Sequence, residues 1–344
     1  MTVSAGRLGL AGLAAPPRAA PTPPPILADV DDLPRYLRDT ALLAEADKLD
    51  AAYAACQVAA VAAAGWDAPG VLARIYSLRG ALSRRMGNLP DAARDGWIAA
   101  KLLAASDADP SGEVAALLVA RRIAVLLDIG DVADADALLT DFGTEPPGGP
   151  GALAFRYVRG RLHAAAGRPG EALADLFGCG ERLAVRRADH PAVLSWRSSA
   201  AAILAEIGTR ESATRLVEAE VALCRQANPA SAMSRPSALG RALRVQGRVL
   251  GAPAGIPASE EAVRVLERSP RRFEYAQALV GCGELLNAAR RKPPARRMLR
   301  EGLALAERCG SPALTERARA AYAAAGGKVR LPPPDQAPAN SVAP

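Results

Sequence analysis

The stretch GALSRRMGNLPDAARDGWIA, residues 80–99, decides the fold of this chain. It places Gly80 seven residues before the turn residue Gly87, and it places Ala92 and Ala99 five and twelve residues after that turn. Small residues at these three places let two helices joined by a short turn cross closely. The stretch therefore predicts a pair of packed helices.

The same turn recurs along the chain between an apolar segment and an Ala-rich one. The turn residues are Gly87, Gly130, Gly167, Gly208, Gly251 and Arg290. Their spacings are 43, 37, 41, 43 and 39 residues. A period near forty with one turn per unit is typical of stacked helix pairs.

Three units carry a small residue at all three crossing places. These repeat-packing residues are Gly80, Ala92 and Ala99; Gly160, Ala172 and Cys179; and Gly283, Ala295 and Gly302. The units around Gly130 and Gly208 have Ile123 and Ala201 where the glycine would stand. We expect six units, a partial unit at 33–64 and a closing helix at 312–325.

Composition supports an all-helical chain. Alanine, the best helix former, accounts for 79 of the 344 residues, whereas aromatic residues make up only 4%. No stretch of 18 or more apolar residues lacks a charge, so we expect no transmembrane helix. Residues 7–15 faintly resemble a secretory signal, but they carry the single charge of Arg7 and prolines follow at once, which favours a chain that is not secreted.

The predicted domain organisation is one helical repeat domain between two Pro-rich ends. Residues 1–32 and 328–344 are expected to be disordered, because they cannot bury enough apolar surface to offset the entropy of ordering. The repeat domain spans 33–327. The segment TEPPGGPG, 144–151, is either an ordinary loop or a hinge between two parts of the array.

Catalytic and metal-binding motifs do not emerge from the sequence. The chain has five cysteines without a CxxC pair and only two histidines, His163 and His190, which lie 27 residues apart. We therefore expect no disulfide framework, no metal site, no cofactor and no enzymatic activity, and a reducing cytoplasm fits best. His163 is interpreted as a helix-end residue, His190 as a turn residue, and the cysteines as packing residues.

Trp97 and Trp196 lie on predicted helices. Both are expected to pack in the core, although a ligand groove lined by one of them is the alternative.

The Gly–x11–Ala–x6–small spacing resembles that of tetratricopeptide repeats, in a degenerate form with a longer period. This predicts an all-α, right-handed α-solenoid of tetratricopeptide-like helix pairs, with a period of about 40. The segments 191–226, 237–251 and 271–327 more narrowly resemble the C-terminal half of large ATP-binding LuxR-family transcriptional regulators of actinobacteria, relatives of the maltose-operon activator.

The resemblance implies a sensor or interaction module without the rest of such a regulator. The family's ATPase needs a GxxxxGK[ST] loop to hold phosphates, and the chain contains no such string. The family's helix-turn-helix would begin shortly after residue 330, where a Pro-rich segment stands instead. We therefore transfer neither ATP hydrolysis nor sequence-specific DNA binding.

Basic charge concentrates near the C-terminal end. Residues 260–330 hold 15 basic and 8 acidic residues, a surplus equal to the net charge of +7 of the whole chain. The candidate basic docking patch comprises Arg290, Arg291, Lys292, Arg296, Arg297 and Arg300. A solvated helix face or a surface for an acidic partner is favoured over direct nucleic-acid binding, because no aromatic residues are interleaved with these cations.

The functional hypothesis is a non-enzymatic module of transcriptional regulation that binds a protein partner or a small effector in its concave groove. The first alternative is a general protein–protein scaffold unrelated to transcription. The weaker alternative is nucleic-acid binding through the basic segment 289–300.

Overall fold

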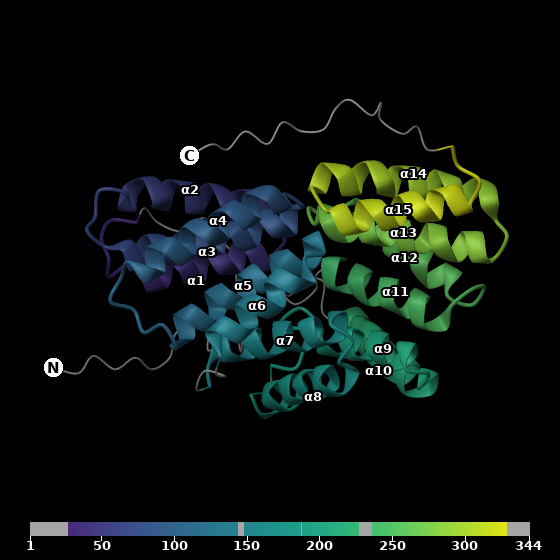
Figure 1. The fold of residues 1–344 in the computed structure, drawn as a ribbon, viewed down its shortest axis with the longest axis horizontal. Helices are drawn as coiled ribbons and strands as arrows, with labels where there is room; N and C mark the ends of the chain where they lie inside the picture. Colours follow the sequence, from purple (N-terminus) through teal and green to yellow (C-terminus); the bar gives the residue numbers. More distant parts are fainter. Residues whose placement is uncertain (1–26, 144–147, 187, 227–235, 329–344) are drawn as a thin grey trace.

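The computed structural model describes residues 27–143, 148–186, 188–226 and 236–328 (Figure 1). Across these ranges the regular structure consists of fifteen α-helices and no strand, which confirms the predicted all-α class. The helices are α1 (Leu33–Glu45), α2 (Leu49–Ala63), α3 (Pro69–Met86), α4 (Leu89–Ala104), α5 (Glu113–Ile129), α6 (Val132–Phe142), α7 (Pro150–Ala165), α8 (Pro169–Val185), α9 (Trp196–Glu206), α10 (Arg210–Gln226), α11 (Pro236–Leu250), α12 (Ile256–Glu267), α13 (Arg272–Ala288), α14 (Lys292–Cys309) and α15 (Pro312–Ala324).

Some of the predicted segments lie outside the residues that the structure describes. Residues 1–26 and 329–344, where disorder was expected, and residues 144–147 of the segment interpreted as a loop or a hinge lie outside the described residues.

Left-handed backbone marks every predicted turn. The φ angles are 86° at Gly87, 104° at Gly130, 75° at Gly167, 90° at Gly208, 70° at Gly251 and 62° at Arg290. Glycine recurs there because it adopts positive φ without steric cost. A further turn of this kind, which the glycine spacing did not predict, lies at Asp47; it joins α1 to α2 with φ of 55°, forty residues before Gly87. Aspartate is one of the residues that tolerate this region.

The two helices of each pair occupy different layers. The first helices, α3, α5, α7, α9, α11 and α13, contact one another in chain order. Each second helix mainly contacts the helices just before and just after it. The first helices therefore form an inner layer and the second helices an outer layer, as in a solenoid.

The array curls until its last helices contact its early ones, with α13 packed against α3 and α15 against α5 (Figure 1). The Ser311 hydroxyl donates a hydrogen bond to the Asp128 carbonyl oxygen at 2.6 Å. Leu89 of α4 belongs to the same core cluster as residues of α10–α15. Contacts between repeats far apart in sequence thus close the array on itself.

Small and medium side chains fill the core. Among side chains less than 2% exposed the largest is Phe155, and most of the next largest are leucines. Of the described helices, none has both the length and the apolar character that a membrane crossing requires.

Candidate functional site

Arginine is the main charged residue of the inner layer. The arginines of the first helices that concern the site are Arg74, Arg79, Arg84, Arg121, Arg122, Arg159, Arg161, Arg241 and Arg244. The contacts of each guanidinium group distinguish arginines that stabilise the fold from arginines that still have hydrogen-bond donors to offer a ligand.

Two arginines are paired with an aspartate within their own repeat. Arg79 donates from Nε and Nη2 to Asp95 at 2.8 and 2.7 Å. Arg159 pairs with Asp175 in the same two-pronged way, at 2.8 and 2.6 Å. Each arginine immediately precedes the crossing glycine of its unit, and each aspartate lies sixteen residues after the arginine. Bidentate pairs of this kind are strong and geometrically specific, so these charges tie the first helix to the second.

Asp128 links three consecutive repeats. Its carboxylate accepts from Arg84 of α3 at 2.5 Å and from Arg161 of α7 at 3.1 Å. Burial by itself would lower the pKa of Arg161, but Asp128 outweighs that effect and the pKa is raised. Asp128 is only 6% exposed, so this carboxylate is held by its arginines rather than by water.

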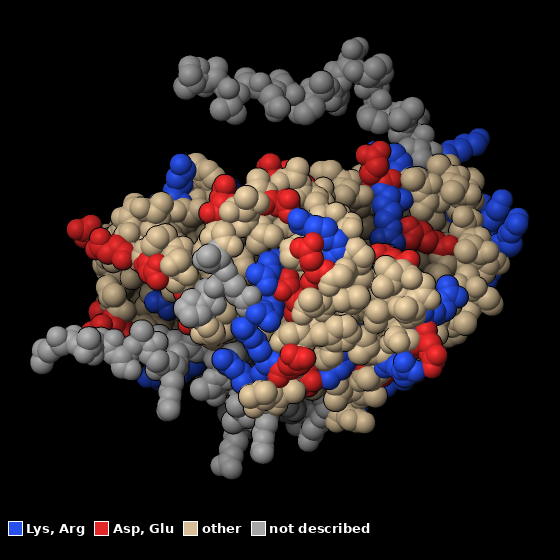
Figure 2. Space-filling view, turned by 60° about the horizontal axis from the view of Figure 1, so that its bottom comes forward, with Lys and Arg blue, Asp and Glu red and all other residues tan. Residues whose placement is uncertain are grey.

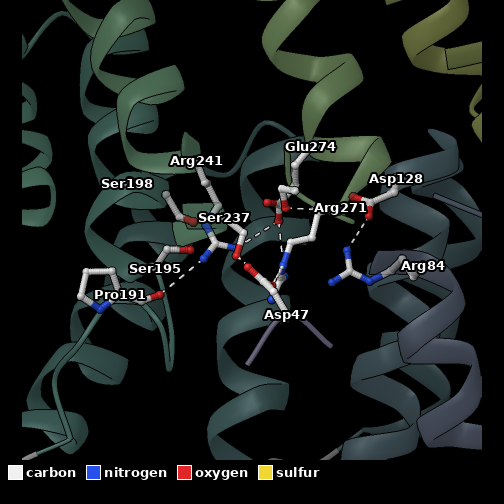
Figure 3. A network of polar contacts seen from close by, with 12 residues as sticks. Asp47, Arg84, Asp128, Pro191, Ser195, Ser198, Ser237, Arg241, Arg271 and Glu274 are labelled. Carbon is white, nitrogen blue, oxygen red and sulfur yellow. Dashed lines mark hydrogen bonds and ion pairs between the residues drawn. The ribbon is translucent and has the colours of Figure 1, made fainter. Parts of the chain in front are cut away.

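A second network crosses the closing contact between the ends of the array (Figure 3). Asp47 accepts from Arg271 Nε at 3.0 Å and from the Ser237 hydroxyl at 3.2 Å. Arg271 Nη1 lies 3.7 Å from Glu274 Oε1, and Arg241 Nη1 donates to the same oxygen at 3.2 Å. The α1–α2 turn is thereby joined to α11 and to the start of α13.

Positive charge dominates around Glu274. Burial by itself would raise its pKa, but Arg241, Arg271, Arg244 and Arg84 outweigh burial and lower it. Four guanidinium groups, from α3, from α11 and from the N-cap of α13, therefore act on one carboxylate.

Hydroxyl groups lie next to Arg241. Its Nη2 donates to the carbonyl oxygen of Pro191 at 3.4 Å (Figure 3). The Tyr157 hydroxyl, close enough to influence Arg241 electrostatically, lies 3.3 Å from the Ser195 hydroxyl and 3.0 Å from that of Ser199. The lining of this part of the inner layer is polar.

The Glu220 carboxyl group is buried in this region, which also holds those of Asp47, Asp128 and Glu274. It accepts from the backbone N–H and the hydroxyl of Ser198 at 2.9 and 2.6 Å. Burial raises its pKa despite these bonds and despite the nearby Arg241. Burial therefore favours the protonated, uncharged form of Glu220.

Arg244 has no acidic partner among the described residues. Its Nε is shielded from solvent and makes no hydrogen bond there, and the same holds for the Nε of Arg241. Burial lowers the pKa of Arg244 to about 10, although Glu274 acts in the opposite direction. Figure 2 shows blue and red side chains close together near the middle of one face, with further charged side chains toward its edges.

The predicted repeat-packing residues lie between the paired helices. A Cβ atom placed on Gly80 would lie 3.1 Å from the carbonyl oxygen of Ala92, and one on Gly160 would lie 3.2 Å from that of Ala172. The corresponding distance from Gly283 to Ala295 is 3.3 Å. The third places, Ala99, Cys179 and Gly302, are buried as well. The helices of these pairs approach each other where the small residues stand.

The structure brings the residues of the basic docking patch together at the α13–α14 turn and on the first half of α14. Five of the six are exposed. Arg296 is partly buried and donates to the Ala325 carbonyl oxygen at 3.2 Å, and Arg291 lies 3.6 Å from Glu260. The patch is on an outer helix and is separate from the inner arginine network.

The two tryptophans have different surroundings. Trp196 is 9% exposed, as expected for the core. The prediction for Trp97 was wrong: it is 58% exposed, with the Lys101 ammonium 5.6 Å from its ring centroid. Helical periodicity gives the reason, because α4 turns Ala92, Asp95 and Ala99 inward and so directs residue 97 to the opposite side.

The histidines and cysteines take structural positions. His163 is 9% exposed, and its Nδ1 lies 3.4 Å from Asp175 Oδ2. His190 Nδ1 accepts from the backbone N–H of Ala192 in a turn. All five cysteines are buried with free thiols. Among the described residues, no cluster of three or more His, Cys, Asp or Glu side chains could hold a metal ion.

The inner charge network was missed at the sequence level. A local signal existed for Arg79–Asp95 and Arg159–Asp175, because both pairs follow the spacing Arg–Gly–x11–Ala–x2–Asp. None existed for Asp47 and Arg271, which are 224 residues apart.

Comparisons with known proteins establish the fold. No protein-family model matches the sequence, and no curated protein matches it either. The solved structure of a Rap protein in complex with competence and sporulation factor superposes with a TM-score of 0.65 and 12% identity, over 85% of this chain and 78% of that one.

A second solved structure is a signal-transduction ATPase with numerous domains and a tetratricopeptide-repeat sensor, from Pyrococcus horikoshii. It superposes with a TM-score of 0.52 and 13% identity, over 87% of this chain and 44% of that one. The chain thus spans less than half the length of that ATPase. The fold is a tetratricopeptide-like α-solenoid, as predicted.

Proposed function

We propose that this chain is a non-enzymatic interaction or sensor module, which binds a small effector or a protein partner on its inner layer of helices. The observation that carries the proposal is the charge network around Arg241 and Arg244, where Arg244 has no acidic partner among the described residues and the shielded Nε groups of both arginines have no acceptor there. Arginine is well suited to recognition because its fixed donors match oxyanion groups.

The solved structures give support at the level of architecture. A Rap protein of similar fold was solved with competence and sporulation factor bound, and another protein of similar fold carries a tetratricopeptide-repeat sensor beside an ATPase. Stacked repeats provide extended surfaces for such binding.

A finer proposal places the module in transcriptional regulation of the LuxR type, in the cytoplasm. Its support is the resemblance of segments 191–226, 237–251 and 271–327 to the helical half of those regulators. In this proposal the exposed basic patch on α14 contacts an acidic surface of another component of the regulator.

The experiment compares an inner and an outer charge reversal. Purified wild-type protein, Arg244→Glu and Arg297→Glu are each incubated with native lysate and with a small-molecule extract, and retained species are identified by mass spectrometry. We expect a species that the wild type and Arg297→Glu retain and that Arg244→Glu loses, with circular dichroism confirming that all three are folded. Equal retention by all three would contradict the proposal. Selective loss with Arg297→Glu would move the binding site to the basic patch.

A further inference from the structure

The charges of the inner network do not balance. Its basic groups are Arg84, Arg161, Arg241, Arg244 and Arg271, and its acidic groups besides Glu220 are Asp47, Asp128 and Glu274. The surplus is two positive charges when Glu220 is protonated and one when Glu220 is ionised. Enclosing an uncompensated charge costs free energy, so the network lacks an anion rather than a further cation.

Unused hydrogen-bonding groups lie in the same place. The Nε groups of Arg241 and Arg244 are shielded from solvent and have no acceptor among the described residues. The Tyr157 hydroxyl is close enough to influence Arg241 electrostatically, and the hydroxyls of Ser195 and Ser199 lie within 3.3 Å of that tyrosine hydroxyl. Guanidinium and hydroxyl donors together suit an oxyanion with several acceptor oxygens.

Two acceptors in the network also lack a donor. Asp47 Oδ2 and Glu274 Oε2 are shielded and accept no hydrogen bond from the described residues. A ligand that satisfies the whole network therefore carries a hydrogen-bond donor, such as an ammonium or hydroxyl group, beside its anionic group.

We propose that the inner layer binds a small phosphate monoester, with Arg241 and Arg244 holding its phosphoryl group and Asp47 and Glu274 facing a donor group of the same molecule. A phosphate monoester carries about −1.5 to −2 charges at neutral pH and three strong acceptor oxygens, which matches the surplus charge. A peptide usually adds buried aromatic anchors to its charged contacts, whereas the groups described around Arg241 and Arg244 are mainly charged and hydroxyl groups. The inference rests on the proposed function, because it names the chemistry of the effector.

The test uses inorganic phosphate and O-phosphoethanolamine as probes, with hexaglutamate as the acidic-peptide comparison. Binding is measured by calorimetry at constant ionic strength on the wild type, Arg244→Met and Arg248→Met. Arg248 is the matched control, since it lies one turn further along α11, is about half exposed and pairs with Glu206. We expect O-phosphoethanolamine to bind more tightly than inorganic phosphate, Arg248→Met to bind within about twofold of the wild type, and Arg244→Met to bind about tenfold or more weakly.

Three results would overturn the inference: neither phosphate probe binds the wild type, Arg244→Met binds as tightly as the wild type, or hexaglutamate binds while both phosphate probes do not. A second measurement needs no variant. Phenylglyoxal modification of the wild-type protein, mapped by mass spectrometry, is expected to slow at Arg241 and Arg244 in the presence of O-phosphoethanolamine, while Arg297 stays equally reactive. Loss of an effector with Arg244→Glu, but no phosphate binding to the wild type, would leave the proposed function standing and reject only this inference.

Discussion

Replacing Arg244 by methionine is expected to stabilise the ligand-free protein. Burial lowers the pKa of Arg244 from its ordinary value above 12 to about 10. A folded-state pKa below the unfolded value means that the charged form is disfavoured in the fold, and this cost is fully present at neutral pH. This lowering of the pKa corresponds to about 3 kcal/mol, which is an upper limit because Arg244 keeps some exposure.

Methionine removes the charge and keeps a long apolar side chain, so the expected gain in the free energy of unfolding is about 1–2 kcal/mol. Urea denaturation at neutral pH in phosphate-free buffer, followed by circular dichroism, measures it. The contrasting variant is Arg79→Met, which leaves the buried Asp95 without its bidentate partner and is expected to lose about 3–5 kcal/mol. If Arg244→Met were destabilised to a similar extent, Arg244 would be a structural residue and the charge argument would be refuted.

Three other changes have expected outcomes. Gly80→Val should lower the free energy of unfolding by about 1–3 kcal/mol, because its Cβ would lie 3.1 Å from the Ala92 carbonyl oxygen, while the helical control Gly281→Val has open space and should lose less. Asp128→Asn should cost about 2–4 kcal/mol by weakening two ion pairs, and an unchanged melting temperature would contradict that role. The five buried cysteines should react with maleimide slowly in the native state and fully in denaturant. The reason is that burial raises the pKa of four of these thiols, to about 12 in Cys56. Fast labelling of the native protein at neutral pH would argue against this packing.

Local backbone demands were predictable from the sequence. A turn that needs positive φ selects glycine, so the regular spacing of glycines placed the turns and, with them, the helix pairs. Arg290 was assigned to a turn by spacing alone and has φ of 62°. Asp47 was missed because no glycine marked that turn. The position of Trp97 was misjudged because a large aromatic residue on a helix suggests burial, whereas the side of α4 that it occupies is set by the small residues.

The candidate site was much less predictable, because the residues that form it are far apart in sequence and follow no motif. Arg241, Arg271 and Glu274 meet Asp47 only where the ends of the array come together. The meeting depends on the rotation between successive repeats, accumulated over the whole array. Degenerate repeats reveal the number of helix pairs but not that rotation.

Closure also divides the turn glycines into two classes that look alike in the sequence. Added Cβ atoms on Gly167, Gly208 and Gly251 would meet nothing within 4 Å, so only positive φ requires glycine there. At Gly87 a Cβ would lie 2.8 Å from the Cys309 sulfur, and at Gly130 it would overlap the side chain of Ala313. The second class therefore satisfies two demands, a left-handed turn and a close contact with the C-terminal helices. An open solenoid would require only the left-handed turn at these positions. The close contacts at Gly87 and Gly130 therefore exist because the ends of the array meet.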